Sequence, residues 1–78
     1  MNVTDRNSFI GFVESLLQDY RTNKDAWENG TLESFLEAMA AYTNDIQGYY
    51  DNTSQDVNAD VASWKVFADI LKGASMYE

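Results

Sequence analysis

The sequence predicts an all-α protein, a compact antiparallel three-helix bundle made by a single domain over residues 1–78. Three segments carry apolar residues at the three- and four-residue spacing of amphipathic helices. No segment alternates with the period of a strand, and the chain contains no proline. Because one short and one longer connection join the three segments, the helices are expected to pack antiparallel around one core.

The first helix is predicted over residues 7–22. Its apolar side chains fall on one arc of the helix: Phe9, Ile10, Phe12, Val13, Leu16, Leu17 and Tyr20. Thr4, Asp5 and Asn7 each have a side-chain oxygen that suits an N-cap. The helical period therefore directs one face of this segment towards the core.

The second helix is predicted to begin after a turn at residues 27–30, because the pair Asn29-Gly30 readily supplies positive φ. Thr31 is the expected N-cap, and Gly48 occupies the place of a glycine that ends a helix. The apolar stripe between them consists of Leu32, Phe35, Leu36, Met39, Tyr42 and Ile46.

A polar loop over residues 51–60, expected to be the most mobile part of the chain, separates the second helix from the third. The third helix is predicted over residues 61–76, with Asp60 as its N-cap and Gly73 as a weak point near its end. Its main stripe is Val61, Trp64, Phe67, Ala68, Leu71 and Ala74. A second strip, Val66, Ile70 and Tyr77, widens the apolar arc beyond what one packing face requires.

The absence of cysteine and histidine limits the chemistry of the chain. It removes disulfides and the usual zinc, haem and iron–sulfur ligand sets, so no cofactor is predicted. It also removes the commonest general base and the thiol nucleophile, and no phosphate-binding glycine loop occurs. Glu33 and Glu37 share a face, but that face is predicted to be solvent-exposed. We therefore predict a protein that is not an enzyme.

One segment resembles the start of a calcium-binding loop. Asp56, Asn58 and Asp60 have the spacing of its first three ligands. The position that needs glycine holds Val61, and the position that needs a bidentate acid holds Phe67. No tight metal site is therefore predicted.

The chain shows no targeting signal at its start and no apolar run long enough to span a bilayer. A reducing cytoplasm is therefore the expected location.

The net charge of −8 arises in one part of the chain. Residues 25–60, the central acidic segment, contain no base and eight acids: Asp25, Glu28, Glu33, Glu37, Asp45, Asp51, Asp56 and Asp60. The remaining five acids balance the five bases. This field disfavours nucleic acid and anionic membranes and favours a basic protein partner. The alternative is that the acids only keep the protein in solution.

Two blocks of the sequence carry a family resemblance. The first is WENGTLESFLEAMAAY at residues 27–42, followed by Asp45 and by GYY.N at residues 48–52; the second is WK.FADIL..A..YE at residues 64–78. The chain resembles a family of small, acidic, uncharacterised bacterial proteins classed as a domain of unknown function. The resemblance implies an intracellular bacterial protein and implies no activity. Within the second block, Lys65 and Asp69 are expected to form a surface ion pair.

The leading hypothesis for function is a protein-interaction module, in its most concrete form an inhibitor or immunity-like protein for a basic partner. Its acidic face would consist of Glu28, Glu33, Glu37, Asp45 and Asp51. Tyr50 and Tyr77 would either add contact area to that face or seal the ends of the core.

Two alternatives from other classes remain open on the sequence alone. One is a structural homo-oligomer, for example a homodimer, whose interface is the strip Val66, Ile70 and Tyr77. The other is a sensor of a small molecule or a metal.

Overall fold

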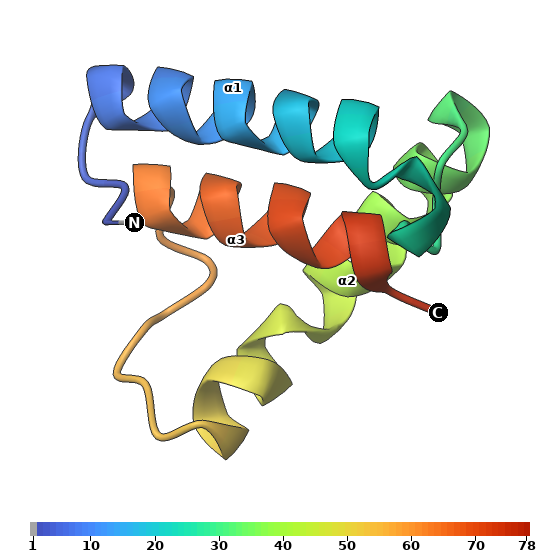
Figure 1. Cartoon of the computed structure of the whole chain (residues 1–78). Helices are drawn as coiled ribbons and strands as arrows, with labels where there is room; N and C mark the ends of the chain where they lie inside the picture. Colours follow the sequence, from blue (N-terminus) through green and yellow to red (C-terminus); the bar gives the residue numbers. More distant parts are fainter. Residues whose placement is uncertain (1) are drawn as a thin grey trace.

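A computed structural model of the chain describes residues 2–78. Its helices are α1 (Arg6–Thr22), the short 3-10 helix η1 (Lys24–Ala26), α2 (Leu32–Asn52) and α3 (Trp64–Met76), and residues 2–78 include no strand. The predicted all-α three-helix bundle is confirmed (Figure 1).

The third helix is the centre of the fold. Helix α3 packs against both other helices, whereas no Cα atom of α1 lies within 8 Å of a Cα atom of α2. In Figure 1, α1 and α3 run side by side in the same direction and α2 crosses them. The Cα radius of gyration is 12.5 Å, against about 11.5 Å for a fully compact domain of this length. The bundle is therefore slightly open, between α1 and α2.

The core lies between α2 and α3. Its centre is formed by Ile46, Tyr50 and Val66, all nearly inaccessible to solvent. Partly buried side chains pack around this centre: Tyr42, Val57, Ala59 and Ile70. Helix α1 contributes no buried residue, so most of the apolar burial that stabilises the fold occurs where α2 meets α3.

Reciprocal hydrogen bonds fix the starts of α1 and α2. Asp5, one of the three predicted N-caps, accepts from the Ser8 amide at 2.8 Å, and the Ser8 hydroxyl accepts from the Asp5 amide at 3.0 Å. Thr31 and Ser34 make the same pair of bonds at the start of α2, which confirms the predicted cap. Each capping box satisfies amides that have no partner inside the helix.

The prediction that Gly48 ends the second helix is wrong. Helix α2 continues through Gly48, no described glycine has positive φ, and Ser54 (φ 58°) is the residue that turns the chain away. The continuation brings Tyr50 into the core, where its side chain is 0% exposed. Burial of such a ring outweighs the cost of about 1 kcal/mol for glycine inside a helix.

The third helix begins later than predicted, at Trp64, with Ser63 as its N-cap instead of Asp60. The Ser63 hydroxyl accepts from the Val66 amide at 3.1 Å. Asp60 belongs instead to a separate turn, because its amide donates to the Asn58 side chain at 2.9 Å. This turn leaves Val61, predicted to be a core residue, exposed in the loop.

The loop between α2 and α3 is tied to α2, which its polar sequence did not indicate. The Gln47 side chain accepts from the Ala59 amide at 2.8 Å and donates to the Val57 carbonyl at 3.0 Å. Val57 and Ala59 also pack against the core. These contacts hold the middle of the loop against the helix.

The turn before α2 also caps the end of α3. The Asn29 side chain donates to the carbonyls of Ala74 and Tyr77 at 2.9 and 2.5 Å, and its amide donates to the Ser75 carbonyl at 3.3 Å. Because α3 has no basic side chain in its last turn, Asn29 supplies donors that these carbonyls would otherwise lack. Gly30 does not adopt the positive φ that the sequence predicts.

At Gly73 the Tyr42 ring of α2 lies close to the backbone of α3. A Cβ atom at Gly73 would overlap this ring. The ring is also flanked by Tyr49 and Tyr77, at centroid distances of 6.4 and 5.2 Å. Gly73 is therefore a packing requirement and not merely a weak point in the helix.

We predict that Gly73→Ala lowers the free energy of unfolding by about 1–3 kcal/mol, because the methyl group displaces a ring that neighbours hold in place. The matched control is Gly48→Ala, also inside a helix but with nothing within 4 Å of the added Cβ. That control should gain about 0.5–1 kcal/mol from helix propensity. Urea unfolding followed by circular dichroism measures both, and a Gly73→Ala protein as stable as wild type would contradict the close packing.

Candidate functional site

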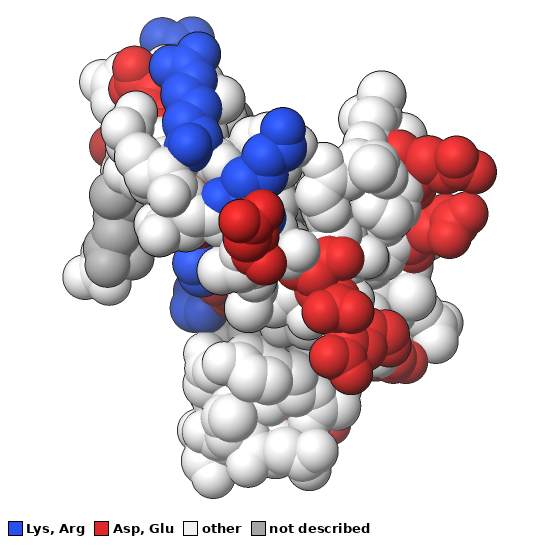
Figure 2. All heavy atoms as spheres, turned by 45° about the vertical axis from the view of Figure 1, so that its right-hand side comes forward, with Lys and Arg blue, Asp and Glu red and all other residues white. Residues whose placement is uncertain are grey.

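All five carboxylates of the predicted acidic face are exposed. Glu33 and Glu37 lie one turn apart near the start of α2, on the side of the helix opposite the buried Ile46. Figure 2 shows acidic side chains spread over the right and centre of one face, with basic side chains mainly at its upper left. The chain therefore presents a surface on which one sign of charge dominates.

Within residues 2–78 none of these five carboxylates takes part in an ion pair. Among residues 2–78 the one ion pair joins Lys65 to Asp69 at 2.7 Å, as the sequence predicts. Like charges one turn apart, as at Glu33 and Glu37, repel by a few tenths of a kcal/mol. A cation from another molecule would relieve this repulsion.

Part of the acidic face forms a shallow groove between α2 and the C-terminal residues. This hollow of about 280 Å³ is lined in part by Glu37, Tyr77 and Glu78. The Tyr77 hydroxyl donates to the Asp45 carboxylate, and this bond raises the pKa of Tyr77. We call Glu37, Tyr77 and Glu78, which line the hollow, together with Asp45, which accepts the hydrogen bond of Tyr77, the acidic groove.

Other members of the predicted acidic face lie apart from the groove. Asp51 does not line the hollow and lies six residues beyond Asp45 on α2, about 9 Å along the helix axis. It accepts from the Gln47 side chain at 3.0 Å. Glu28 is exposed in the connection between η1 and α2. Each can take part in long-range attraction, but neither belongs to the groove.

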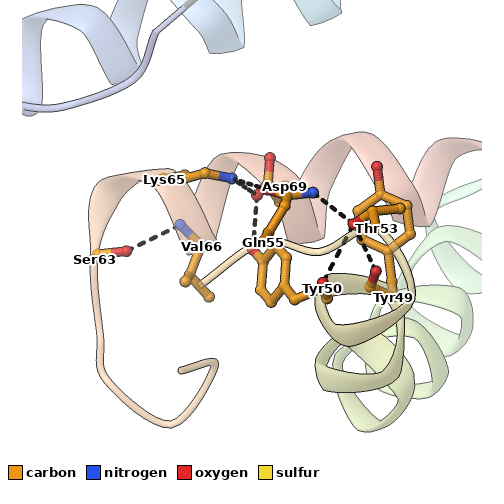
Figure 3. Close-up of polar contacts among 8 residues, drawn as sticks. All are labelled: Tyr49, Tyr50, Thr53, Gln55, Ser63, Lys65, Val66 and Asp69. Carbon is orange, nitrogen blue, oxygen red and sulfur yellow. Dashed lines mark hydrogen bonds and ion pairs between the residues drawn. The ribbon is translucent and has the colours of Figure 1, made fainter. Parts of the chain in front are cut away.

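Of the two alternatives for Tyr50, a contact residue or a seal for the core, the structure contradicts the first, because the extra turns of α2 bury its ring completely. Its hydroxyl donates to Asp69 at 2.7 Å, and the Lys65 ammonium lies 5.1 Å from the centre of its ring. Lys65 also donates to Gln55 at 3.3 Å, and Gln55 donates to Thr53 at 2.9 Å (Figure 3). The network therefore joins the end of α2, the following loop and α3.

The strip predicted to mediate a homodimer is not an exposed surface. Val66 is 3% exposed, and Ile70 packs against the core formed by Ile46 and Tyr50. The physical reason is again the length of α2, whose last turns cover this side of α3. The apolar arc is wide because α3 packs against two helices.

Residues 2–78 contain no cluster of three or more His, Cys, Asp or Glu side chains that could hold a metal ion. In the segment that resembles a calcium loop, the Asn58 side chain accepts from a backbone amide. No helix of the described chain is both long and apolar enough to cross a membrane.

A second hollow, which the sequence did not indicate, lies between α1 and the start of α2. This apolar groove has a volume of about 420 Å³. Its apolar lining consists of Val13, Leu16, Leu17, Tyr20, Trp27, Leu32, Phe35 and Leu71. Helical periodicity assigned most of these side chains to a closed core, and it could not reveal that α1 and α2 stay apart.

Hydrogen bonds fix the two large rings of the apolar groove. The Tyr20 hydroxyl donates to the Gly30 carbonyl at 2.6 Å, and the Trp27 indole donates to the Asp19 carboxylate at 2.8 Å. The Trp27 bond lowers the pKa of Asp19. The rings meet edge to face, 5.0 Å between centroids. Their polar atoms are thus satisfied, which leaves apolar ring surface to line the groove.

The sequence matches the model of one protein family. The model of a family of unknown function (DUF7660) matches residues 5–78, which include both blocks that carry the resemblance. No curated protein and no solved structure is significantly similar to the chain.

We predict that Tyr50→Phe lowers the free energy of unfolding by about 1–2 kcal/mol near pH 7, because it removes a buried hydrogen bond to a charged group. Burial, together with the Asp69 carboxylate, raises the pKa of Tyr50 above its usual value. A raised pKa in the folded state stabilises the fold fully below the unfolded pKa of about 10 and progressively less as pH rises above it. The difference between wild type and Tyr50→Phe should therefore shrink above about pH 10.

Urea unfolding at several pH values measures this difference. The matched control is Tyr49→Phe, which removes a hydroxyl from an exposed ring and should leave stability near that of wild type at pH 7. A Tyr50→Phe deficit that stays constant from pH 7 to about pH 11 would contradict the role of the hydroxyl.

Proposed function

The chain belongs to this family of unknown function, and we propose that it is a small protein-interaction module whose acidic face binds a basic protein. In its most concrete form it is an inhibitor or immunity-like protein that covers a basic functional surface. We also propose a cytoplasmic location in a bacterium. The lack of cysteine supports this location, since the fold needs no oxidising compartment.

The proposal rests on the observation that the acids of the central acidic segment have no basic partners within residues 2–78. The central acidic segment has eight acids and no base, and none of these acids takes part in an ion pair within residues 2–78. Such a surface attracts basic proteins and speeds their association, and it repels nucleic acid and anionic lipid.

The acidic groove offers a defined place at which a basic side chain of a partner can bind. Glu37, Asp45 and Glu78 lie around Tyr77, which contributes ring surface beside the carboxylates. Arginine and lysine side chains form charge-assisted hydrogen bonds with carboxylates and stack on aromatic rings. A protruding basic side chain of a partner is the group that this groove fits best.

The proposal is tested with two variants of equal net charge. Glu33→Gln/Glu37→Gln removes two charges from the acidic face, and Asp56→Asn/Asp60→Asn removes two charges from exposed acids in the loop after α2. Wild type and both variants are immobilised, exposed to a nuclease-treated lysate of the host at low and high salt, and analysed by quantitative mass spectrometry.

We expect wild type to retain one basic protein in stoichiometric amount and to release it at high salt. The acidic-face variant should lose this protein, whereas the loop variant should keep it. Equal loss from both variants would mean that the net charge of the chain, and not the acidic face, retains the protein, which would contradict the proposed binding surface. Retention of no salt-sensitive protein would refute the proposal.

A further inference from the structure

The turn before α2 contains a chemically reactive pair of residues. Asn29-Gly30 is the only Asn-Gly pair in the sequence. In such a pair the backbone nitrogen of the glycine can attack the side-chain carbonyl carbon of the asparagine. Glycine favours this attack because it has no Cβ atom to obstruct the approach and because its backbone is the most flexible.

The conformation of the turn does not require glycine at position 30. Gly30 does not have positive φ. A Cβ atom there would lie 3.8 Å from the Tyr20 ring, which is an ordinary contact distance. The turn can therefore accommodate alanine at this position. What glycine adds here is the reactivity of the neighbouring Asn29.

Hydrogen bonds hold both residues of the pair in the folded chain. Asn29 donates to three carbonyls at the end of α3, two from its side chain at 2.9 and 2.5 Å and one from its backbone at 3.3 Å. The Gly30 carbonyl accepts from the Tyr20 hydroxyl at 2.6 Å. The attack needs rotation of the Asn29 side chain and of the backbone between the two residues. These hydrogen bonds oppose both rotations, so the folded turn slows the reaction.

We propose that Asn29 is a site of spontaneous deamidation, which is protected in the folded chain and reacts when the end of α3 separates from the turn. The Gly30 nitrogen bonds to the side-chain carbon of Asn29 and loses its proton, and ammonia leaves, which forms a five-membered succinimide ring. Water then opens the ring at either of its carbonyls, and aspartate or isoaspartate results. Asparagine and water thus give the acid and ammonia, and no oxidant or cofactor is needed.

The product of the reaction cannot restore the cap on α3. An ionised carboxylate only accepts hydrogen bonds, whereas the carbonyls of Ala74 and Tyr77 need a donor. Its negative charge would also lie at the negative end of the α3 dipole. Because Tyr77 and Glu78 line the acidic groove, loss of the cap disturbs that groove as well. Deamidation at Asn29 therefore makes a transient opening of the chain permanent.

The modification is tested by incubating the full chain near neutral pH, with and without guanidinium chloride, and following position 29 by peptide mass spectrometry. We expect the reaction to be at least about tenfold slower in the folded protein, because only the open fraction of molecules reacts. The variant Gly30→Ala should suppress the reaction in both conditions, since its methyl group obstructs the attack.

The protecting role of the turn is tested with Tyr20→Phe, which removes the hydroxyl that binds the Gly30 carbonyl. The matched control Tyr49→Phe removes the hydroxyl of an exposed ring on α2. Deamidation of the folded chain should be about threefold faster or more in Tyr20→Phe, because one hydrogen bond of the turn is lost. It should be unchanged in the control, and all three proteins should react alike in guanidinium chloride.

The consequence for the cap is tested with Asn29→Asp, which gives the aspartate product directly. This variant should unfold at a lower urea concentration than Asn29→Ala, because a carboxylate repels the carbonyls in addition to removing the donors. The control Asn2→Asp adds the same charge at an exposed position and should unfold near the wild-type midpoint. An Asn29→Asp chain that does not fold would agree with this expectation.

Three results would overturn the inference. They are no deamidation at Asn29 in guanidinium chloride, equal rates in the folded and unfolded chain, and an Asn29→Asp protein as stable as wild type. None of these results bears on the charge of the acidic face, so the lysate experiment would still decide the proposed function.

Discussion

The packing of Tyr50 against α3 is the interaction on which the rest of the structure depends. Its ring is enclosed between α2 and α3, and its hydroxyl donates to Asp69, which also pairs with Lys65. Burying this ring favours the turns of α2 beyond Gly48, and those turns cover Val66. The core therefore forms at the crossing of α2 and α3, and α1 is docked along one side of α3.

Both candidate surfaces follow from this asymmetric core. Because the apolar side of α2 is directed at α3, Glu33 and Glu37 lie on its exposed side. Because α3 separates α1 from α2, a groove lined by Leu17 and Leu32 remains open between them. The acidic face and the apolar groove thus both lie on this small domain.

Local signals in the sequence predicted the fold class, the first capped turns and the Lys65–Asp69 pair, because each depends on neighbouring residues. These local signals failed where packing between helices determines the structure. Helix α2 continues through Gly48 because its last turns bury the ring of Tyr50. Gly73 is required because the Tyr42 ring of α2 packs against α3 at this position. Periodicity correctly identified the apolar faces, but it cannot indicate whether two such faces meet, so the groove between α1 and α2 was missed.

Amide hydrogen exchange of the full chain tests the central claim most directly, namely that the core lies between α2 and α3 while α1 occupies the edge of the bundle. We expect the slowest exchange in residues 42–50 of α2 and residues 66–74 of α3, because these segments contain the buried core. Amides of α1 should exchange measurably faster, since none of its residues is fully buried. Protection in α1 equal to that in α3 would contradict the account, because it would require a closed bundle in which α1 also packs against α2.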